Sequence, residues 1–161
     1  EIEKNFEFLK KIQLACVKTI AYENLDILDG KPLSLDADDL FEKIVEQGRG
    51  GYCFELNTFF RSLLNGLGFD AYQAMAYILN PDGTQQPPAH NVILCNLNGK
   101  KYFFDVGYGG PVPYKALELR EGLQNGFELI KKEDTWFLYR VTQIECRPLT
   151  AWQVIRNIIK M

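Results

Sequence analysis

The chain has 161 residues, of which 47% are apolar and 13% aromatic, and this is enough for one sizeable hydrophobic core. A formal charge of -3 over 24% charged residues leaves no basic surface for a nucleic-acid backbone. No apolar run approaches the roughly 18 residues that cross a bilayer, and residues 1–11 are charged and amphipathic rather than signal-like. We therefore expect a cytoplasmic protein whose partners are neither nucleic acid nor a membrane.

The first half of the chain has the spacing of helices. Apolar residues predict a helix over residues 2–18. A second helix is predicted between a cap at Ser34 or Asp36 and a stop at Gly48, because apolar residues recur there at steps of three and four. A third follows the glycine pair of the RGGYC segment and places Cys53 at or just inside its start.

The second half has the pattern of antiparallel strands. Residues 71–79 are a strand candidate, and residues 90–97 and 100–106 flank Asn98-Gly99. This dipeptide is a strong hairpin signal because both residues tolerate a positive φ. A second hairpin is predicted over residues 127–141.

Helices followed by an antiparallel sheet predict the α+β class. We expect a helical lobe over residues 1–68 that carries a cysteine nucleophile, and an antiparallel β lobe over residues 69–141 that carries a histidine and an aspartate. The apolar spacing of residues 142–161 predicts a C-terminal helix, capped by Thr150.

The cysteines suggest chemistry rather than a structural framework. The four of them, at positions 16, 53, 95 and 146, are far apart and none belongs to a CxxC pair, so reduced thiols are expected. The chain has a single histidine and no close pair of zinc ligands, so no metal is expected. At a helix start, Cys53 faces unpaired N–H groups and the positive end of the helix dipole, which both favour a thiolate. On this basis alone a buried, structural cysteine remains the alternative.

The predicted hairpin brings the single histidine to an acid. A two-residue turn at Asn98-Gly99 pairs Val92 with Asp105. His90 lies two residues before Val92, so its imidazole and the Asp105 carboxylate project from the same face within side-chain reach. A three-residue turn would place them on opposite faces. Together with Cys53, they supply a nucleophile, a general base and the acid that orients it.

Three glycines, Gly107, Gly109 and Gly110, follow Asp105 closely. Glycines at this place let the backbone approach a substrate or supply N–H donors to an oxyanion. The same VGYGGP segment is also typical of a loop that ends a strand.

Four segments together resemble the arylamine N-acetyltransferase family. They are AYENLDIL (21–28), RGGYCFE (49–55), AHNVIL (89–94) and DVGYGG (105–110). They occur in the family's order, and the steps of 37 residues from Cys53 to His90 and of 15 from His90 to Asp105 are similar to the family's. The resemblance covers roughly residues 9–141. It implies a helical first lobe, a β-barrel-like second lobe and a cysteine-protease-like Cys-His-Asp core.

The resemblance also implies a ping-pong reaction with acetyl-CoA as co-substrate and an arylamine or hydrazine as acceptor. Cys53 would carry the acetyl group as a thioester, His90 would pair with its thiolate, and Asp105 would orient the imidazolium. The aromatic residues that line the family's acceptor pocket fall on Tyr22, Tyr77 and Tyr108, next to Gly109 and Gly110. Ala21 stands where the family usually has proline.

Two alternatives stay open on the sequence. A cysteine hydrolase of the papain or transglutaminase type uses the same three residues in the same order. The family's chains are also markedly longer, and the resemblance ends at Val141. Residues 142–161 match no recognised part of the family, and one interpretation of the helix predicted there is a remnant of the family's third lobe, which helps to enclose acetyl-CoA. The chain is therefore expected to lack much of that lobe, so a truncated, non-catalytic form is the second alternative.

Overall fold

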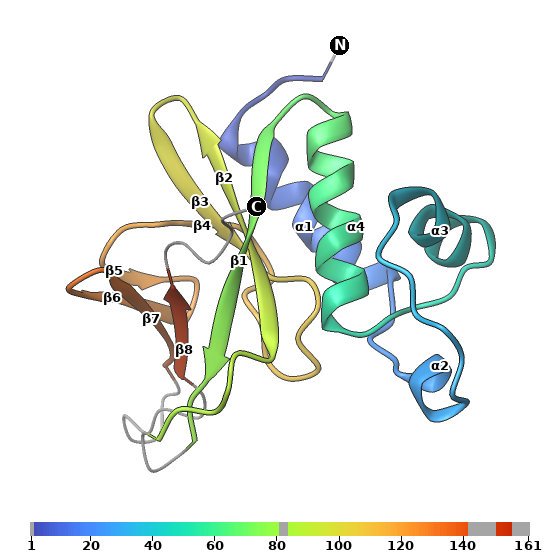
Figure 1. The fold of residues 1–161 in the computed structure, drawn as a ribbon. Helices are drawn as coiled ribbons and strands as arrows, with labels where there is room; N and C mark the ends of the chain where they lie inside the picture. Colours follow the sequence, from blue (N-terminus) through green and yellow to red (C-terminus); the bar gives the residue numbers. More distant parts are fainter. Residues whose placement is uncertain (1, 81–83, 142–150, 156–161) are drawn as a thin grey trace.

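Helices form the first part of the chain in the computed structural model, and two of them, α1 (Phe6–Thr19) and α4 (Cys53–Gly66), cover one face of a sheet (Figure 1). The structure describes residues 2–80 and 84–141, and the backbone of residues 151–155. The helices are α1 (Phe6–Thr19), α2 (Leu25–Leu28), α3 (Ala37–Phe41), the π-helix η1 (Glu42–Glu46) and α4 (Cys53–Gly66). No helix among these is long and apolar enough to cross a membrane. The cytoplasmic location stays a prediction.

The helix starts follow the capping signals of the sequence. The Asn5 side chain accepts a hydrogen bond from the Phe8 N–H at the start of α1, and the Asp36 side chain accepts one from Asp38 at the start of α3. Asp36 rather than Ser34 is thus the cap of the second predicted helix. That helix continues through η1 to Glu46, two residues before the predicted stop. The third predicted helix is α4, which begins at Cys53 itself.

The strands form one antiparallel sheet in the order β4-β3-β2-β1-β8-β7-β6-β5. Their bounds are β1 (Asp70–Ile78), β2 (His90–Leu97), β3 (Lys100–Phe104), β4 (Leu117–Glu118), β5 (Gly122–Gln124), β6 (Phe127–Lys132), β7 (Thr135–Arg140) and β8 (Ala151–Ile155). Both predicted hairpins are confirmed, as β2–β3 and β6–β7.

The register of the β2–β3 hairpin is the one that a two-residue turn dictates. Leu97 pairs with Lys100, and Ile93 pairs with Phe104. Asn98 and Gly99 both adopt a positive φ, of 52° and 76°. The turn residues therefore act as the sequence predicted.

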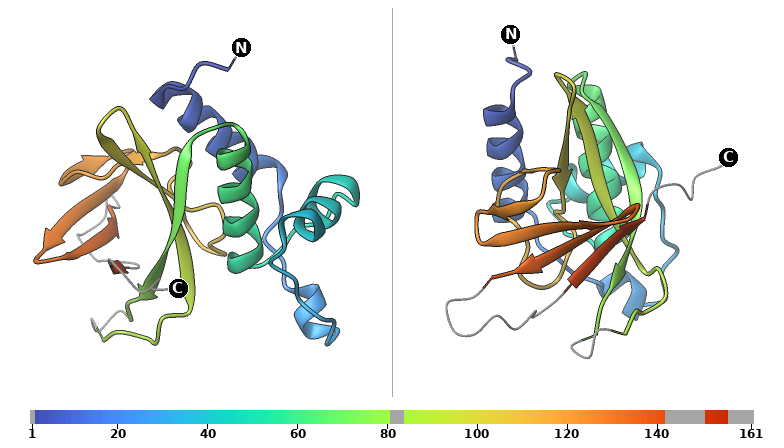
Figure 2. Two further views of the ribbon diagram at one scale, coloured as in Figure 1. Left: turned by 45° about the horizontal axis from the view of Figure 1, so that its top comes forward. Right: turned by 90° about the vertical axis from the view of Figure 1, so that its left-hand side faces the viewer.

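Over the described residues the sheet is curled but not closed, so the α+β class holds while a closed β-barrel in the second lobe does not. Figure 2 shows β5 to β8 crossing the direction of β1 and β2. The short strands β4 and β5 end the order and do not pair with each other. The Gln124 side-chain amide bridges them instead, accepting from the Glu118 N–H at 3.0 Å and donating to the Glu118 carbonyl at 2.8 Å. Closure needs a continuous main-chain ladder, which strands of two and three residues joined by a short turn do not supply.

The predicted C-terminal helix over 142–161 is also wrong in the part that the structure describes. Residues 151–155 form β8, which pairs with β1 on one side and β7 on the other. A segment inserted between two strands gains main-chain hydrogen bonds along both edges, and this tertiary gain outweighs a helical apolar spacing. The remainder of that predicted helix, with Thr150 as its cap, lies outside the described residues.

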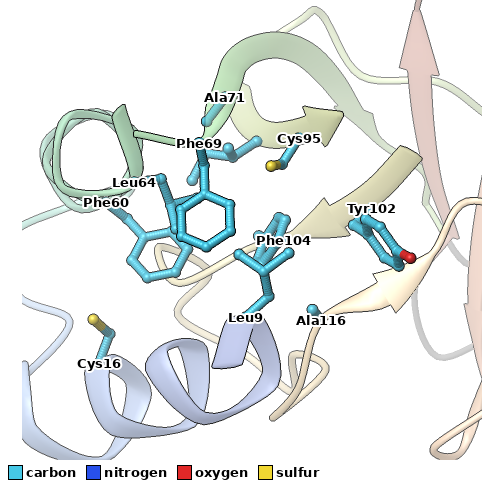
Figure 3. Packing of buried hydrophobic residues seen from close by; sticks show 11 residues of the cluster. Leu9, Cys16, Phe60, Leu64, Phe69, Ala71, Cys95, Tyr102, Phe104 and Ala116 are labelled. Atoms are coloured by element: carbon cyan, nitrogen blue, oxygen red, sulfur yellow. The ribbon is translucent and has the colours of Figure 1, made fainter. Parts of the chain in front are cut away.

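The apolar core lies on both faces of the sheet. On one face, α1 and α4 pack against the sheet through residues shown in Figure 3, among them Leu9, Phe60 and Phe104. On the other face, residues of β1, β2 and β3 such as Val92 pack against β6 and β7. Each large apolar side chain buried in this way contributes about 1.5–3 kcal/mol. The core therefore runs across the division at residue 68 that the sequence suggested between two lobes.

Candidate active site

The ends of three elements bring Cys53, His90 and Asp105 together. Cys53 is the first residue of α4, His90 is the first of β2, and Asp105 follows directly after β3. Figure 1 shows α4 and β2 beginning at the same, lower end of the molecule. Residues 37 and 15 positions apart thereby share one site.

His90 and Asp105 form a buried pair, as the hairpin register predicted. His90 Nε2 lies 2.8 Å from Asp105 Oδ2, and both side chains are almost fully buried. Asp105 Oδ1 accepts hydrogen bonds from the Gly107 N–H at 3.0 Å and from Asn57 Nδ2 at 3.1 Å. Both carboxylate oxygens are thus engaged, which is how a buried anion is stabilised.

Asp105 determines the charge of His90. Burial by itself lowers the pKa of the imidazole, but the charge and hydrogen bond of Asp105, aided by the Cys53 side chain, outweigh burial and raise the pKa of His90 to about 9. At neutral pH the ring is therefore an imidazolium. A cation beside a cysteine at a helix start stabilises the thiolate form.

Cys53 is 9% exposed as a whole residue, and its Sγ lies 3.9 Å from the Ala89 carbonyl oxygen. The loop after Asp105 packs directly on the backbone of Cys53. A Cβ atom at Gly107 would lie 2.8 Å from the Cys53 carbonyl oxygen and 2.9 Å from its Cα, closer than real contacts allow. Gly107 therefore has a packing role that brings this loop onto the first turn of α4.

Two of the three predicted pocket tyrosines lie near Cys53, His90 and Asp105, which we call the triad residues. The Tyr108 ring is perpendicular to the His90 ring, with 5.8 Å between centroids. Tyr22 and Tyr108 both line a cavity of about 210 Å³, together with Val106 and Gly110. A Cβ at Gly109 would lie 2.8 Å from the Tyr22 ring, so Gly109 packs against that tyrosine.

Tyr77 is not part of this group. It follows Ala76 on β1, and Ala76 pairs across the strands with His90. Side chains alternate along a strand, so Tyr77 projects from the opposite face of the sheet. It does not line the cavity that holds Tyr22 and Tyr108.

The chain is similar in sequence to known acetyltransferases. A family model described as N-acetyltransferase matches residues 5–149. The arylamine N-acetyltransferase of Escherichia coli is 32% identical over 140 residues, which cover 83% of this chain and 50% of that protein. The chain belongs to the arylamine N-acetyltransferase family. The arylamine N-acetyltransferase / N-hydroxyarylamine O-acetyltransferase of Salmonella typhimurium is 31% identical over 138 residues, or 82% of this chain and 49% of that one.

Solved structures of arylamine N-acetyltransferases have the same fold. The enzyme from Salmonella typhimurium superposes with a TM-score of 0.89 at 26% identity, over 98% of this chain and 59% of that chain. The Mycobacterium marinum arylamine N-acetyltransferase in complex with CoA superposes with a TM-score of 0.85 at 28% identity, over 95% and 60%. The chain thus spans about half the length of the curated relatives that it matches.

A charged cluster that no sequence pattern predicts lies beside the start of α4. Glu55, almost fully buried in the first turn of α4, lies 2.7 Å from Lys43 Nζ, which lies 2.8 Å from Asp26. Arg49 joins Asp26 at 2.8 Å and Glu23 at 2.7 Å. We call these five residues the ion-pair cluster. Glu55 and Arg49 stand in the cysteine motif, but nothing in the spacing of Lys43 indicates that it joins them.

Backbone contacts tie the segment of Tyr22 to the cysteine motif. The Gly51 N–H donates to the Ala21 carbonyl at 3.2 Å, and the Glu23 N–H donates to the Gly51 carbonyl at 2.9 Å. A Cβ at Gly50 would overlap the Ala21 carbonyl oxygen. The glycine pair therefore lets the tyrosine segment lie against the turn that leads into Cys53.

Buried amides also hold the site. Asn57 contacts Asp105 as described above, and Gln13 of α1 is fully buried and donates to the Pro113 carbonyl. A polar residue on an apolar helix face is the signal that could have found them. Over residues 2–80 and 84–141, no group of three or more histidine, cysteine, aspartate or glutamate side chains could hold a metal ion.

Proposed function

We propose that this chain carries the acyl-transfer site of an arylamine N-acetyltransferase, with acetyl-CoA as donor and an arylamine or hydrazine as acceptor. The observation that supports it best is the buried His90–Asp105 pair, 2.8 Å apart, beside a cysteine at the start of a helix. The names of the relatives supply the substrate class, and one solved relative is described as a complex with CoA.

The first half-reaction loads Cys53. Its thiolate attacks the thioester carbonyl of acetyl-CoA, the bond from that carbonyl to the CoA sulfur breaks, and the acetyl group stays on Cys53 as a new thioester. The His90 imidazolium gives its proton to the departing CoA thiolate. The Asp105 carboxylate keeps the ring oriented throughout.

The second half-reaction unloads Cys53. The acceptor amine attacks the Cys53 thioester, and neutral His90 takes the proton that the amine loses, so that the thiolate and imidazolium are restored as the amide leaves. The cavity beside Tyr22 and Tyr108 is the place for a flat aromatic amine, because its walls are tyrosine rings and apolar side chains.

The test is to incubate the protein with acetyl-CoA, measure its intact mass and locate any adduct by peptide mapping. We expect one acetyl group on Cys53, which leaves when an arylamine is added and reappears as an equal amount of acetylated amine. Burial raises the pKa of both Cys16 and Cys95 to about 11, so neither competes at neutral pH. Mapping separates Cys53 from Cys146, and Cys53→Ser is the control for the adduct.

Two results would contradict the proposal. An adduct lost to water as fast without the amine as with it would indicate a hydrolase. A folded protein whose Cys53 reacts with iodoacetamide, yet never gains an acetyl group, would be a non-catalytic form.

A further inference from the structure

One buried amide touches all three elements that carry the triad. Asn57 has no solvent exposure and lies one helical turn after Cys53 on α4. Residues four apart share a face of a helix, so Asn57 stands directly behind Cys53 on the side that meets the hairpin.

The hydrogen bonds of Asn57 reach strand β2 and the segment directly after β3. Its Nδ2 donates to the Asn91 carbonyl at 2.7 Å and to Asp105 Oδ1 at 3.1 Å. Its Oδ1 accepts from the Val106 N–H at 3.0 Å. A backbone N–H can only donate, so this bond fixes which end of the amide faces Val106 and leaves Nδ2 facing two acceptors.

The contact with Asn57 gives the two oxygens of the Asp105 carboxylate different partners. Oδ1 receives Asn57 and the Gly107 N–H, which leaves Oδ2 for His90. The packing is tight on the same side, because a Cβ at Gly107 would lie 2.8 Å from Asn57 Nδ2. The α4 helix, which carries Cys53, therefore fixes the rotamer of Asp105 through Asn57.

We infer that Asn57 is a positioning residue of the acyl-transfer site: it holds Asp105 in the orientation that serves His90 and fixes the Cys53 helix against the hairpin. The inference rests on the proposed function, because it assigns a role within that site. Asn57 does not contact the reacting atoms and acts through Asp105.

The same helix supplies a control for the bridge between helix and sheet. Asn65 also bridges α4 to the sheet, donating to the Ala71 carbonyl at 3.1 Å and accepting from the Ala71 N–H at 2.9 Å. Its partners are backbone groups of β1 and include no triad residue. Asn65 is exposed whereas Asn57 is buried, so the two differ in what a new charge costs in stability. A role for Asn57 limited to bridging α4 and the sheet predicts that, in folded protein, neither substitution moves the pH profile of Cys53 alkylation.

The experiment compares Asn57→Asp with Asn65→Asp. Each variant keeps the shape of the side chain and the oxygen that accepts a hydrogen bond, but replaces the N–H donors by a carboxylate oxygen. The readouts are the rate of Cys53 alkylation by iodoacetamide as a function of pH, and the single-turnover rate of Cys53 acetylation at several acetyl-CoA concentrations.

We expect Asn57→Asp to move the alkylation profile to higher pH by about one unit, because a new carboxylate beside Asp105 disfavours the Cys53 thiolate. The maximal acetylation rate should fall about ten- to a hundredfold, the value of a lost hydrogen bond to a charged group. The acetyl-CoA concentration at half-maximal rate should change little. Asn65→Asp should lower the melting temperature and leave both profiles in place.

A folded Asn57→Asp protein with the alkylation profile of Asn65→Asp would overturn the inference. If Asn57→Asp does not fold, Asn57→Ser removes Nδ2 without adding charge, and an unchanged maximal acetylation rate in that variant would overturn it equally. A wild-type chain that is alkylated but never acetylated would instead refute the proposed function. The pH profile of alkylation still tests the role of Asn57 in that case.

Discussion

The two sides of the proposed active site are held by different forces. His90 and Asp105 lie at one end of a hairpin whose main-chain ladder is covered by apolar residues, and the paired residues Ile93 and Phe104 are fully buried. Cys53 follows a turn that the ion-pair cluster anchors through side chains that still meet water. Lys43 is 14% and Arg49 is 29% exposed.

This difference predicts how each side fails. A hairpin held by a ladder and an apolar core responds little to salt, and its weak point is the charge of the single buried pair. The turn before Cys53 depends on opposite charges, so substitution or neutralisation of one member weakens the whole cluster. Substitutions on one side should therefore leave the other side unchanged.

The largest effect is expected from Asp105→Asn. The change keeps the shape of the side chain but removes the charge that holds the pKa of His90 high, so the imidazolium that supports the Cys53 thiolate is lost. We expect the single-turnover acetylation rate to fall about 10³- to 10⁴-fold, as when a triad carboxylate is neutralised elsewhere. Rapid quenching followed by intact-mass measurement gives the rate.

Asp70→Asn is the control for this change. Asp70 accepts a hydrogen bond from Asn96 at the other end of β2, where its carboxylate faces no triad residue. Its acetylation rate should equal that of the wild type. An Asp105→Asn protein with the wild-type rate would show that acetylation of Cys53 does not need the His90–Asp105 pair.

Lys43→Met disrupts the ion-pair cluster beside Cys53. This substitution leaves Glu55, only 4% exposed, without its ion pair, whereas Asp26 keeps its ion pair with Arg49. Breaking a buried pair costs about 3 kcal/mol of unfolding free energy. Urea denaturation measures it.

Lys100→Met is the matched control, because the pair of Lys100 with Glu118 is 57% exposed on the lysine side. It should cost less than about 1 kcal/mol. Equal costs for the two variants would mean that the ion-pair cluster does not hold the turn before Cys53.

The two sides should also fail at opposite ends of the pH scale. The pKa of His90 is raised to about 9 from an unfolded value near 6.5, so its contribution to stability is complete below about pH 6.5 and is lost as pH rises through 9. The slope between these values is at most about 1.4 kcal/mol per pH unit. Hydrogen bonds from Lys43 and Arg49 hold the pKa of Asp26 well below its usual range, so its contribution exists above about pH 4 and is lost as pH falls.

Denaturant titrations from pH 3 to pH 10 measure the free energy of unfolding, and so the loss of stability at both the acid and the alkaline end. Asp105→Asn should flatten the loss of stability above pH 6.5, and Arg49→Met should weaken the loss of stability below pH 4. If Asp105→Asn still loses stability as pH rises through 9, a group other than His90 causes that loss.

The sequence predicts one side of the site better than the other for a physical reason. Asn98-Gly99 determines a local register, and a register fixes which side chains share a face many residues from the turn. His90 and Asp105 could therefore be paired from residues within one hairpin. The approach of Cys53 depends on how α4 packs against that hairpin, which no local pattern determines, and the family resemblance supplied it.

The remaining differences have the same origin. Residues 151–155 form a strand because they pair with β1 on one side and β7 on the other. The sheet stays unclosed between β4 and β5, which end its strand order and are short. Lys43 and Asn57 are brought to the site by tertiary packing. Their own neighbours in the sequence give no sign of Glu55 or Asp105 as partners.

The smallest expected effect tests whether the turn still controls the hairpin once the protein has folded. Gly99 has a φ of 76° and nothing near its Cβ position, so Gly99→Ala strains the backbone and should cost about 1 kcal/mol in urea denaturation. Gly66→Ala, at an open helical site with an ordinary φ, should be neutral or stabilising by up to about 1 kcal/mol. The pH profile of Cys53 alkylation should match the wild type in both variants, because buried Ile93 and Phe104 hold the register independently of the turn. A shifted profile in Gly99→Ala would show that the turn itself keeps His90 beside Asp105.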